Sequence, residues 1–104
     1  MSEMKIIAIS RDLIQKDFGL EEEIILNDEN HEEQLINHLI KVVKYLLDHD
    51  FERLLNIMYR IDLPENRVKN VLSTCNPQNL ARELSVMILD REKSKATTRI
   101  QYSK

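Results

Sequence analysis

The scarcity of turn-forming residues constrains this chain most. Its 104 residues contain a single glycine, Gly19, and two prolines, Pro64 and Pro77. A β-rich fold of this length needs repeated tight turns, and glycine and proline supply the backbone conformations that such turns require. The sequence therefore predicts an all-α protein, a small bundle of four to five helices.

The stretch 32–48 is the strongest helical signal. At 100° per residue its aliphatic side chains share one arc of roughly 160°. They are Leu35, Ile36, Leu39, Ile40, Val42, Val43, Leu46 and Leu47. Polar residues fill the opposite side. Because an apolar face this wide exceeds what one neighbour covers, we expect this helix to lie between others, in the middle of the core.

Start signals divide the following residues into three more helices. Asp50 is suited to cap a helix over 51–61, since its carboxylate can accept a hydrogen bond from a free N–H of the first turn. Pro64 is suited to begin the next helix. Asn76 followed by Pro77 repeats that signal for a last helix.

The inner face of the last helix changes character along its length. Leu80, Leu84 and Ile88 align on one stripe, and Arg91 and Lys95 then fall on the same stripe. The helix therefore either leaves the core there or meets an acidic partner. We expect a single helical domain over 1–104, with a core at about 32–90 and a basic C-terminal tail at 91–104.

The N-terminal third is less clearly patterned. The runs 5–9 and 23–26 are rich in isoleucine, and short apolar runs fit either a helix or a strand. Ser10 is suited to cap a short helix that ends before Gly19, which would take the left-handed position after the last turn. We interpret this region as helical and leave the strand alternative open for both runs.

Two parts of the chain carry a resemblance to known proteins. They are the stretch 58–63 (Met-Tyr-Arg-Ile-Asp-Leu) and the ending that runs from 90–93 (Asp-Arg-Glu-Lys) to Tyr102. Over about 35–102 the chain resembles a group of small uncharacterised helical proteins from bacteria. That group has no established activity, so the resemblance implies a bacterial, cytoplasmic, helical protein and transfers no catalytic residue.

Cysteine usage and hydropathy agree with a cytoplasmic location. Cys75 is the only cysteine, so an internal disulfide is impossible, which fits a reducing compartment better than secretion. No apolar run approaches the roughly 18 residues of a membrane span. We therefore expect no membrane partner.

Catalytic and metal-binding patterns are weak. His31, His38 and His49 share one helical face, but spacings of seven and eleven residues separate them too far for one metal ion. With one glycine, the chain lacks a phosphate-binding loop. Cys75 carries no signature of a nucleophile, and we interpret it as a filler between helices. We expect neither a metal, nor a cofactor, nor an enzyme.

Charge is distributed unevenly. The segment 17–33 holds eight acids and no lysine or arginine, whereas residues from Arg91 onward hold five bases and one acid. Such runs are usually a solvated loop and a frayed tail. The alternative is that one of them binds a partner.

Two functions follow from these patterns. Val86 and Leu89 point away from the inner stripe of the last helix, which suggests a protein-interaction or adaptor module, with this surface binding a partner or a second copy. The alternative is an RNA- or DNA-associated protein that uses its tail, with Lys93, Lys95 and Arg99 contacting phosphates and Tyr102 stacking on a base.

The helices at 51–61 and 64–73 have helix-turn-helix lengths. Four bases against three acids over 51–73 are too few for a DNA-reading face, so a plain helical hairpin is the better interpretation.

Overall fold

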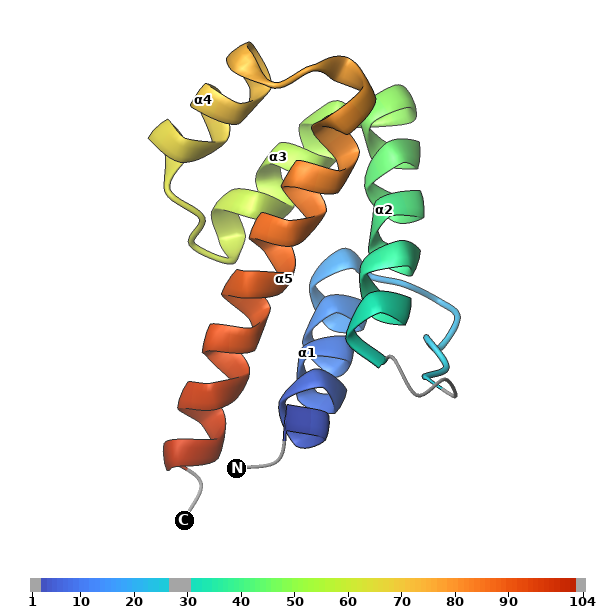
Figure 1. Ribbon diagram of the computed structural model, residues 1–104, viewed down its shortest axis with the longest axis vertical. Helices are drawn as coiled ribbons and strands as arrows, with labels where there is room; N and C mark the ends of the chain where they lie inside the picture. Colours follow the sequence, from blue (N-terminus) through green and yellow to red (C-terminus); the bar gives the residue numbers. More distant parts are fainter. Residues whose placement is uncertain (1–2, 27–30, 103–104) are drawn as a thin grey trace.

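The computed structural model describes residues 3–26 and 31–102, and this part of the chain contains five helices and no strand. The helices are α1 (Glu3–Phe18), α2 (His31–His49), α3 (Phe51–Arg60), α4 (Glu65–Thr74) and α5 (Pro77–Tyr102) (Figure 1). The predicted all-α bundle is confirmed. None of the helices in the described part is both long enough and apolar enough to cross a membrane.

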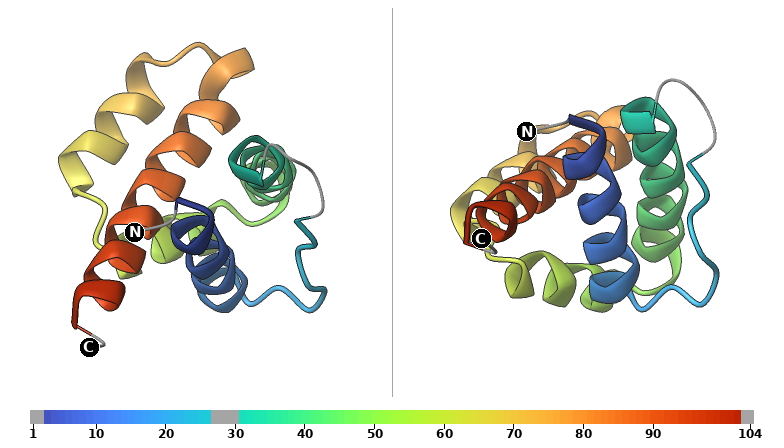
Figure 2. Two further views of the ribbon diagram at one scale, coloured as in Figure 1. Left: turned by 60° about the horizontal axis from the view of Figure 1, so that its bottom comes forward. Right: turned by 90° about the horizontal axis from the view of Figure 1, so that it is seen from below.

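The longest helix, α5, runs through the centre of the bundle (Figure 1). It contacts α1, α2 and α4, and α1 and α2 run antiparallel to it. Figure 2 shows α1 lying between α5 and α2 when the molecule is seen from below. As its wide apolar face predicts, α2 lies between neighbours and contacts α1, α3 and α5.

The start signals read from the sequence hold at two helices and shift at a third. The Asp50 carboxylate accepts a hydrogen bond from the Arg53 N–H at 3.2 Å and caps α3. Asn76 Oδ1 accepts one from the Gln78 N–H at 3.0 Å, and Pro77 is the first residue of α5. Pro64 precedes α4 as its cap residue instead of occupying the first turn.

The N-terminal region is helical from Glu3, so run 5–9 is part of α1 and not a strand. Ser10 does not cap this helix: it lies inside it, buried, and its hydroxyl donates a hydrogen bond to the Ile6 carbonyl oxygen at 2.7 Å. Gly19 ends the helix with φ 62°, as expected. Segment 20–26 forms neither helix nor strand, so the helical interpretation of run 23–26 is wrong, as is the strand alternative; the Ile24 N–H is bonded by the Gln15 side chain instead of by a backbone carbonyl.

The core is larger than the predicted 32–90, and that boundary is wrong at both ends. Ile7, Ile14 and Phe18 of α1 are buried in the same cluster as α2 and α3. Their spacing of seven and four residues follows one helical face, so burial outweighs the strand preference of the isoleucines. At the other end, Ala96 and Ile100 of α5 are also buried.

Candidate functional site

The predicted basic tail is not frayed, because α5 continues to Tyr102. Three ion pairs join this part of α5 to distant segments: Lys93 to Glu32 (2.6 Å), Lys95 to Asp17 (3.1 Å) and Arg91 to Asp62 (3.7 Å). The acidic partner of the basic stripe is therefore the chain itself. Two of these acids belong to segment 17–33, so part of the acidic region serves the fold. Asp28 and Glu29 of that segment lie outside the described residues.

The four residues expected to contact nucleic acid do not form one free surface. Lys93 and Lys95 are both held in internal ion pairs, and their side chains are each 28% exposed. Arg99 and Tyr102 remain exposed near the end of α5. The expectation of a solvent-facing basic tail is thus wrong for the two lysines.

The expected interface on α5 is also reduced. Val86 is exposed, but Leu89 is 1% exposed and belongs to the core, so the prediction that it faces solvent is wrong. The reason is that α5 has helices on several sides: α4 packs on it in addition to α1 and α2. The apolar side chains of α5 must therefore cover a wider arc of the helix than the single stripe of Leu80, Leu84 and Ile88.

A buried carboxyl group lies on α5 at Glu92, whose side chain is completely inaccessible to solvent. Neither of its oxygens makes a hydrogen bond within the described structure. Lys95 Nζ lies 3.1 Å from Glu92 Oε1, an ion-pair distance, but its hydrogen bond goes to Asp17 Oδ2 at 3.1 Å. Asp17, Glu92 and Lys95 form what we call the acid cluster, between the end of α1 and the middle of α5.

Burial changes the protonation of this cluster. Removal from water, and then the adjacent Asp17 carboxylate, raise the pKa of Glu92; Lys95 opposes the shift, and the net pKa is about 7. For Lys95, burial lowers the pKa, but the contacts of its ammonium with the Asp17 and Glu92 carboxylates outweigh burial, so the net direction is upward. Sequence reasoning missed Glu92, although its place four residues after buried Ile88 was a usable signal.

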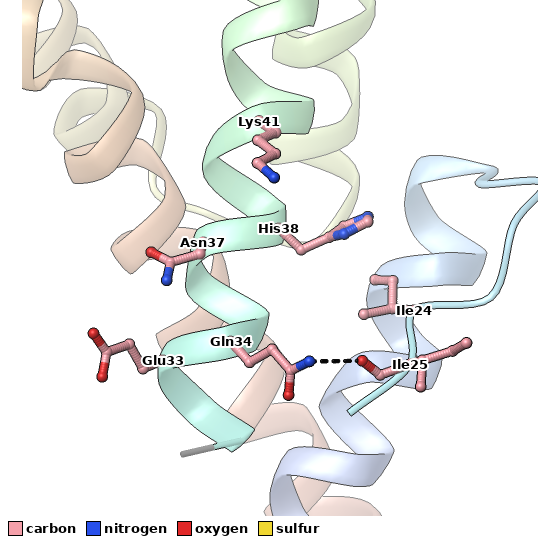
Figure 3. Close-up of a pocket in the computed structure, with 7 residues that line it drawn as sticks. All are labelled: Ile24, Ile25, Glu33, Gln34, Asn37, His38 and Lys41. Carbon is pink, nitrogen blue, oxygen red and sulfur yellow. Dashed lines mark hydrogen bonds between the residues drawn. The ribbon is translucent and has the colours of Figure 1, made fainter. Parts of the chain in front are cut away.

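A groove of about 510 Å³ lies between α2 and segment 20–26 (Figure 3). Its lining residues, which define the α2 groove, are Ile24, Ile25, Glu33, Gln34, Asn37, His38 and Lys41. Ile25 is 68% exposed at the rim. Figure 3 shows the side chains of Gln34 and His38 pointing from α2 toward this segment. No periodic pattern in the sequence marked this groove.

Hydrogen bonds fix both sides of the groove wall. The Ile24 N–H donates to Gln15 Oε1 of α1 at 2.6 Å, and the Ile24 side chain is buried. Gln34 Nε2 of α2 donates to the Ile25 carbonyl oxygen at 3.0 Å (Figure 3). The segment is therefore held by two helices even though it has no regular secondary structure.

The groove continues into an exposed stripe along α2. His38, Lys41, Tyr45 and His49 follow one another at spacings of three and four residues, all exposed, and they define the outer stripe of α2. The rings of Tyr45 and His49 stack with centroids 4.4 Å apart and planes 13° from parallel. One helix thus carries a groove at one end and a flat aromatic surface at the other.

A second hollow, of about 450 Å³, lies between the end of α1 and α3. Basic Lys16, Arg53 and Arg60 and acidic Asp17, Asp50 and Glu52 line it, together with Gly19, Asn56 and Ile57. The charges of opposite sign balance, so the hollow has no strong preference for a charged ligand. Its importance is that Asp17, 14% exposed, connects the acid cluster to solvent.

The histidines and the cysteine do not assemble into a reactive centre. Within 3–26 and 31–102, no group of three or more His, Cys, Asp or Glu side chains is placed to hold a metal ion. His38 lines the α2 groove and His49 stacks on Tyr45. The Cys75 thiol, at the end of α4, donates to the Asn76 carbonyl oxygen at 3.5 Å.

Comparison with known proteins adds no assignment. No protein-family model matches the chain, and no curated protein and no solved structure shows significant similarity to it.

Proposed function

We propose that the protein is a non-enzymatic interaction module of the bacterial cytoplasm that binds a protein partner in the α2 groove. The observation that carries this proposal is an aliphatic side chain, Ile25, held 68% exposed at the rim of a groove of about 510 Å³. A concave surface that combines apolar side chains with a few convergent polar groups is the default candidate for a binding site.

The lining of the groove suits a polypeptide ligand. The Asn37 amide, the His38 ring and the Lys41 ammonium, all lining residues of the groove, are able to make hydrogen bonds to a bound chain. Burial of Ile25 under a partner would contribute about 1–2 kcal/mol of binding free energy. Polar groups around an apolar anchor are the usual composition of a protein interface.

The wall of the groove is ordered before any partner arrives. Hydrogen bonds from Ile24 to Gln15 and from Gln34 to Ile25 hold segment 20–26 against two helices. A surface fixed in this way loses less conformational freedom on binding than a loose loop does. The outer stripe of α2 extends the surface, and tyrosine, as at Tyr45, is one of the residue types enriched at interface hot spots.

A binding experiment tests the proposal. Tagged wild-type protein, Ile25→Asp and Val86→Asp are used to capture partners from a bacterial lysate, with and without nuclease treatment. Both substitutions place an aspartate at an exposed β-branched residue, so Val86→Asp is the matched control. We expect a nuclease-resistant partner that is lost with Ile25→Asp and retained with Val86→Asp.

Two other results would contradict the proposal, each in its own way. Loss of the partner with Val86→Asp alone would move the interface to α5, where a second copy of the chain is the first candidate to test by sedimentation velocity. Loss of all captured material after nuclease treatment would favour the nucleic-acid alternative. Arg99 and Tyr102, exposed near the end of α5, would then be the contacts to replace.

A further inference from the structure

The acid cluster is a feature that the proposed function does not use. Glu92 is fully buried with no hydrogen bond to either oxygen among the described residues, and such a group is costly unless it is paired or neutral. It is not deeply isolated, because Asp17 beside it lines the hollow between α1 and α3. The acid cluster therefore borders solvent at Asp17, whose side chain is 14% exposed.

The charged groups around Glu92 come from two helices. Asp17 faces it from α1, and Lys95 faces it from α5, one turn further along. Lys16 of α1 and Arg53 and Arg60 of α3 line the hollow beside Asp17. Glu32 of α2 binds Lys93, Asp62 after α3 pairs with Arg91, and Arg53 of α3 donates to the Phe18 carbonyl oxygen at 2.9 Å.

The charge of the cluster depends on one proton. With Glu92 protonated, the negative Asp17 and positive Lys95 balance, and the buried site is neutral. Without the proton, two carboxylates share one ammonium and the site has a net charge of −1 between α1 and α5. A buried carboxylate pair with one counter-ion favours the state that keeps a proton.

We propose that Asp17, Glu92 and Lys95 form a proton-binding site, and that the proton bound there strengthens the docking of α1 on α5. The proposal is independent of the partner and of the α2 groove. It makes the contact between the first and last helices of the described chain sensitive to pH in the physiological range.

The direction of the effect follows from proton linkage. The pKa of Glu92 is about 7 in the folded chain, against 4.5 for an unperturbed glutamate, so the folded state binds more protons between these values. The stability that Glu92 contributes is then fully present below about pH 4.5, falls as pH rises to 7 and levels off above, and its share of the folding equilibrium constant falls by at most about tenfold per pH unit.

Two measurements on the full chain test the proposal. The first follows the side-chain carboxyl carbon of Glu92 by NMR from pH 4 to 9 in the wild-type protein. The second compares urea unfolding across that range for wild type, Glu92→Gln and Glu83→Gln. Glutamine mimics the protonated state, and Glu83 is an exposed glutamate of α5 that serves as the control. Amide-exchange protection factors, corrected for intrinsic rates, report on α1 and α4 separately.

We expect the Glu92 carbon to titrate near neutral pH. We also expect Glu92→Gln to lose the fall in stability between pH 5 and 7, and Glu83→Gln to keep it. Protection of α1 should fall with pH more than protection of α4, which contacts α5 elsewhere. A Glu92 midpoint near 4.5 would overturn the proposal, and this result does not depend on whether Glu92→Gln folds. Equal pH dependence in wild type and Glu92→Gln, or equal loss of protection in α1 and α4, would overturn it as well.

Discussion

The two halves of α5 bury the same face by different chemistry. In the first half the buried side chains are aliphatic, as at Leu84, Ile88 and Leu89. In the second half the helix remains covered, but its contacts with α1 and α2 include charged pairs, and the position one turn after Ile88 is the buried Glu92. The hydropathy of a helix shows where its side chains are apolar. It does not show where the helix ceases to be buried.

The ion pairs explain why the second half stays in the bundle. Lys93 and Lys95 reach acids that are 61 and 78 residues earlier in the chain. These pairs join partly exposed side chains, and they form only when the partner helices are correctly placed. Ala96 and Ile100 add buried apolar contacts in this half, and the ion pairs link it to the start of α2 and the end of α1.

The largest effect is expected from a charge placed in the apolar half. Leu89→Asp would bury an unpaired carboxylate in the core and should cost more than about 4 kcal/mol, enough to unfold the chain. Thermal unfolding followed by circular dichroism measures this. Val86→Asp, three residues earlier and exposed, should retain the helical spectrum. A folded Leu89→Asp that merely changed its oligomeric state would place Leu89 at the surface.

Shortening a buried leucine of α2, which packs against α5, should have the next largest effect on stability. Leu39 and Leu46 of α2 are 0% and 6% exposed, which confirms the predicted core positions. Leu39→Ala or Leu46→Ala should each lower the free energy of unfolding by about 2–5 kcal/mol through lost burial and an unfilled cavity. Chemical denaturation gives the value, and a change of only a few tenths would contradict the assigned packing.

Removal of the cation from the acid cluster should have an intermediate effect. Lys95→Met keeps the aliphatic stem but leaves Asp17 and Glu92 without their shared ammonium, at a cost of about 1–3 kcal/mol at pH 8. The loss should shrink at pH 5, because protonation of Glu92 relieves the repulsion. Urea unfolding at the two pH values checks this. An equal loss of stability at pH 5 and pH 8 would show that the contribution of Lys95 does not depend on the protonation of Glu92.

The partly exposed ion pair between Glu32 and Lys93 should contribute least to stability. Glu32 and Lys93 lie 2.6 Å apart, but their side chains are 42% and 28% exposed. Their contact raises the pKa of Lys93, mainly through the hydrogen bond to Glu32. Glu32→Gln should cost at most about 1 kcal/mol, and high salt should remove the difference from wild type. A cost above that of Lys95→Met would invert the order of the two pairs.

The sequence was sufficient for the helical class and for several helix boundaries. Scarce glycine, the 3.6-residue period of α2, the Asp50 cap and the Asn76–Pro77 start are local signals, so they survive without knowledge of the partners. The start of α1 was not readable, because isoleucine-rich turns fit a strand equally well until burial against α5 decides. Leu89 was misplaced because the number of helices around α5 is a property of the whole fold.

The functional features depended even more on long-range contacts. Lys93 and Lys95 look like a binding surface until their acids are located on α1 and α2. Ile25 belongs to an irregular segment, so periodicity does not say that it borders a groove. Glu92 was visible on the inner stripe, but a single acid in a basic stretch is ordinarily read as a solvated residue.

Amide hydrogen exchange along α5 tests the central claim most directly, namely that its charged half is docked and not a free tail. At neutral pH we expect amides around Ala96 to be protected to a degree approaching that of amides around Leu84, because both stretches are buried against other helices. Exchange around Ala96 at the rate of an unstructured peptide, with Leu84 still protected, would contradict the account.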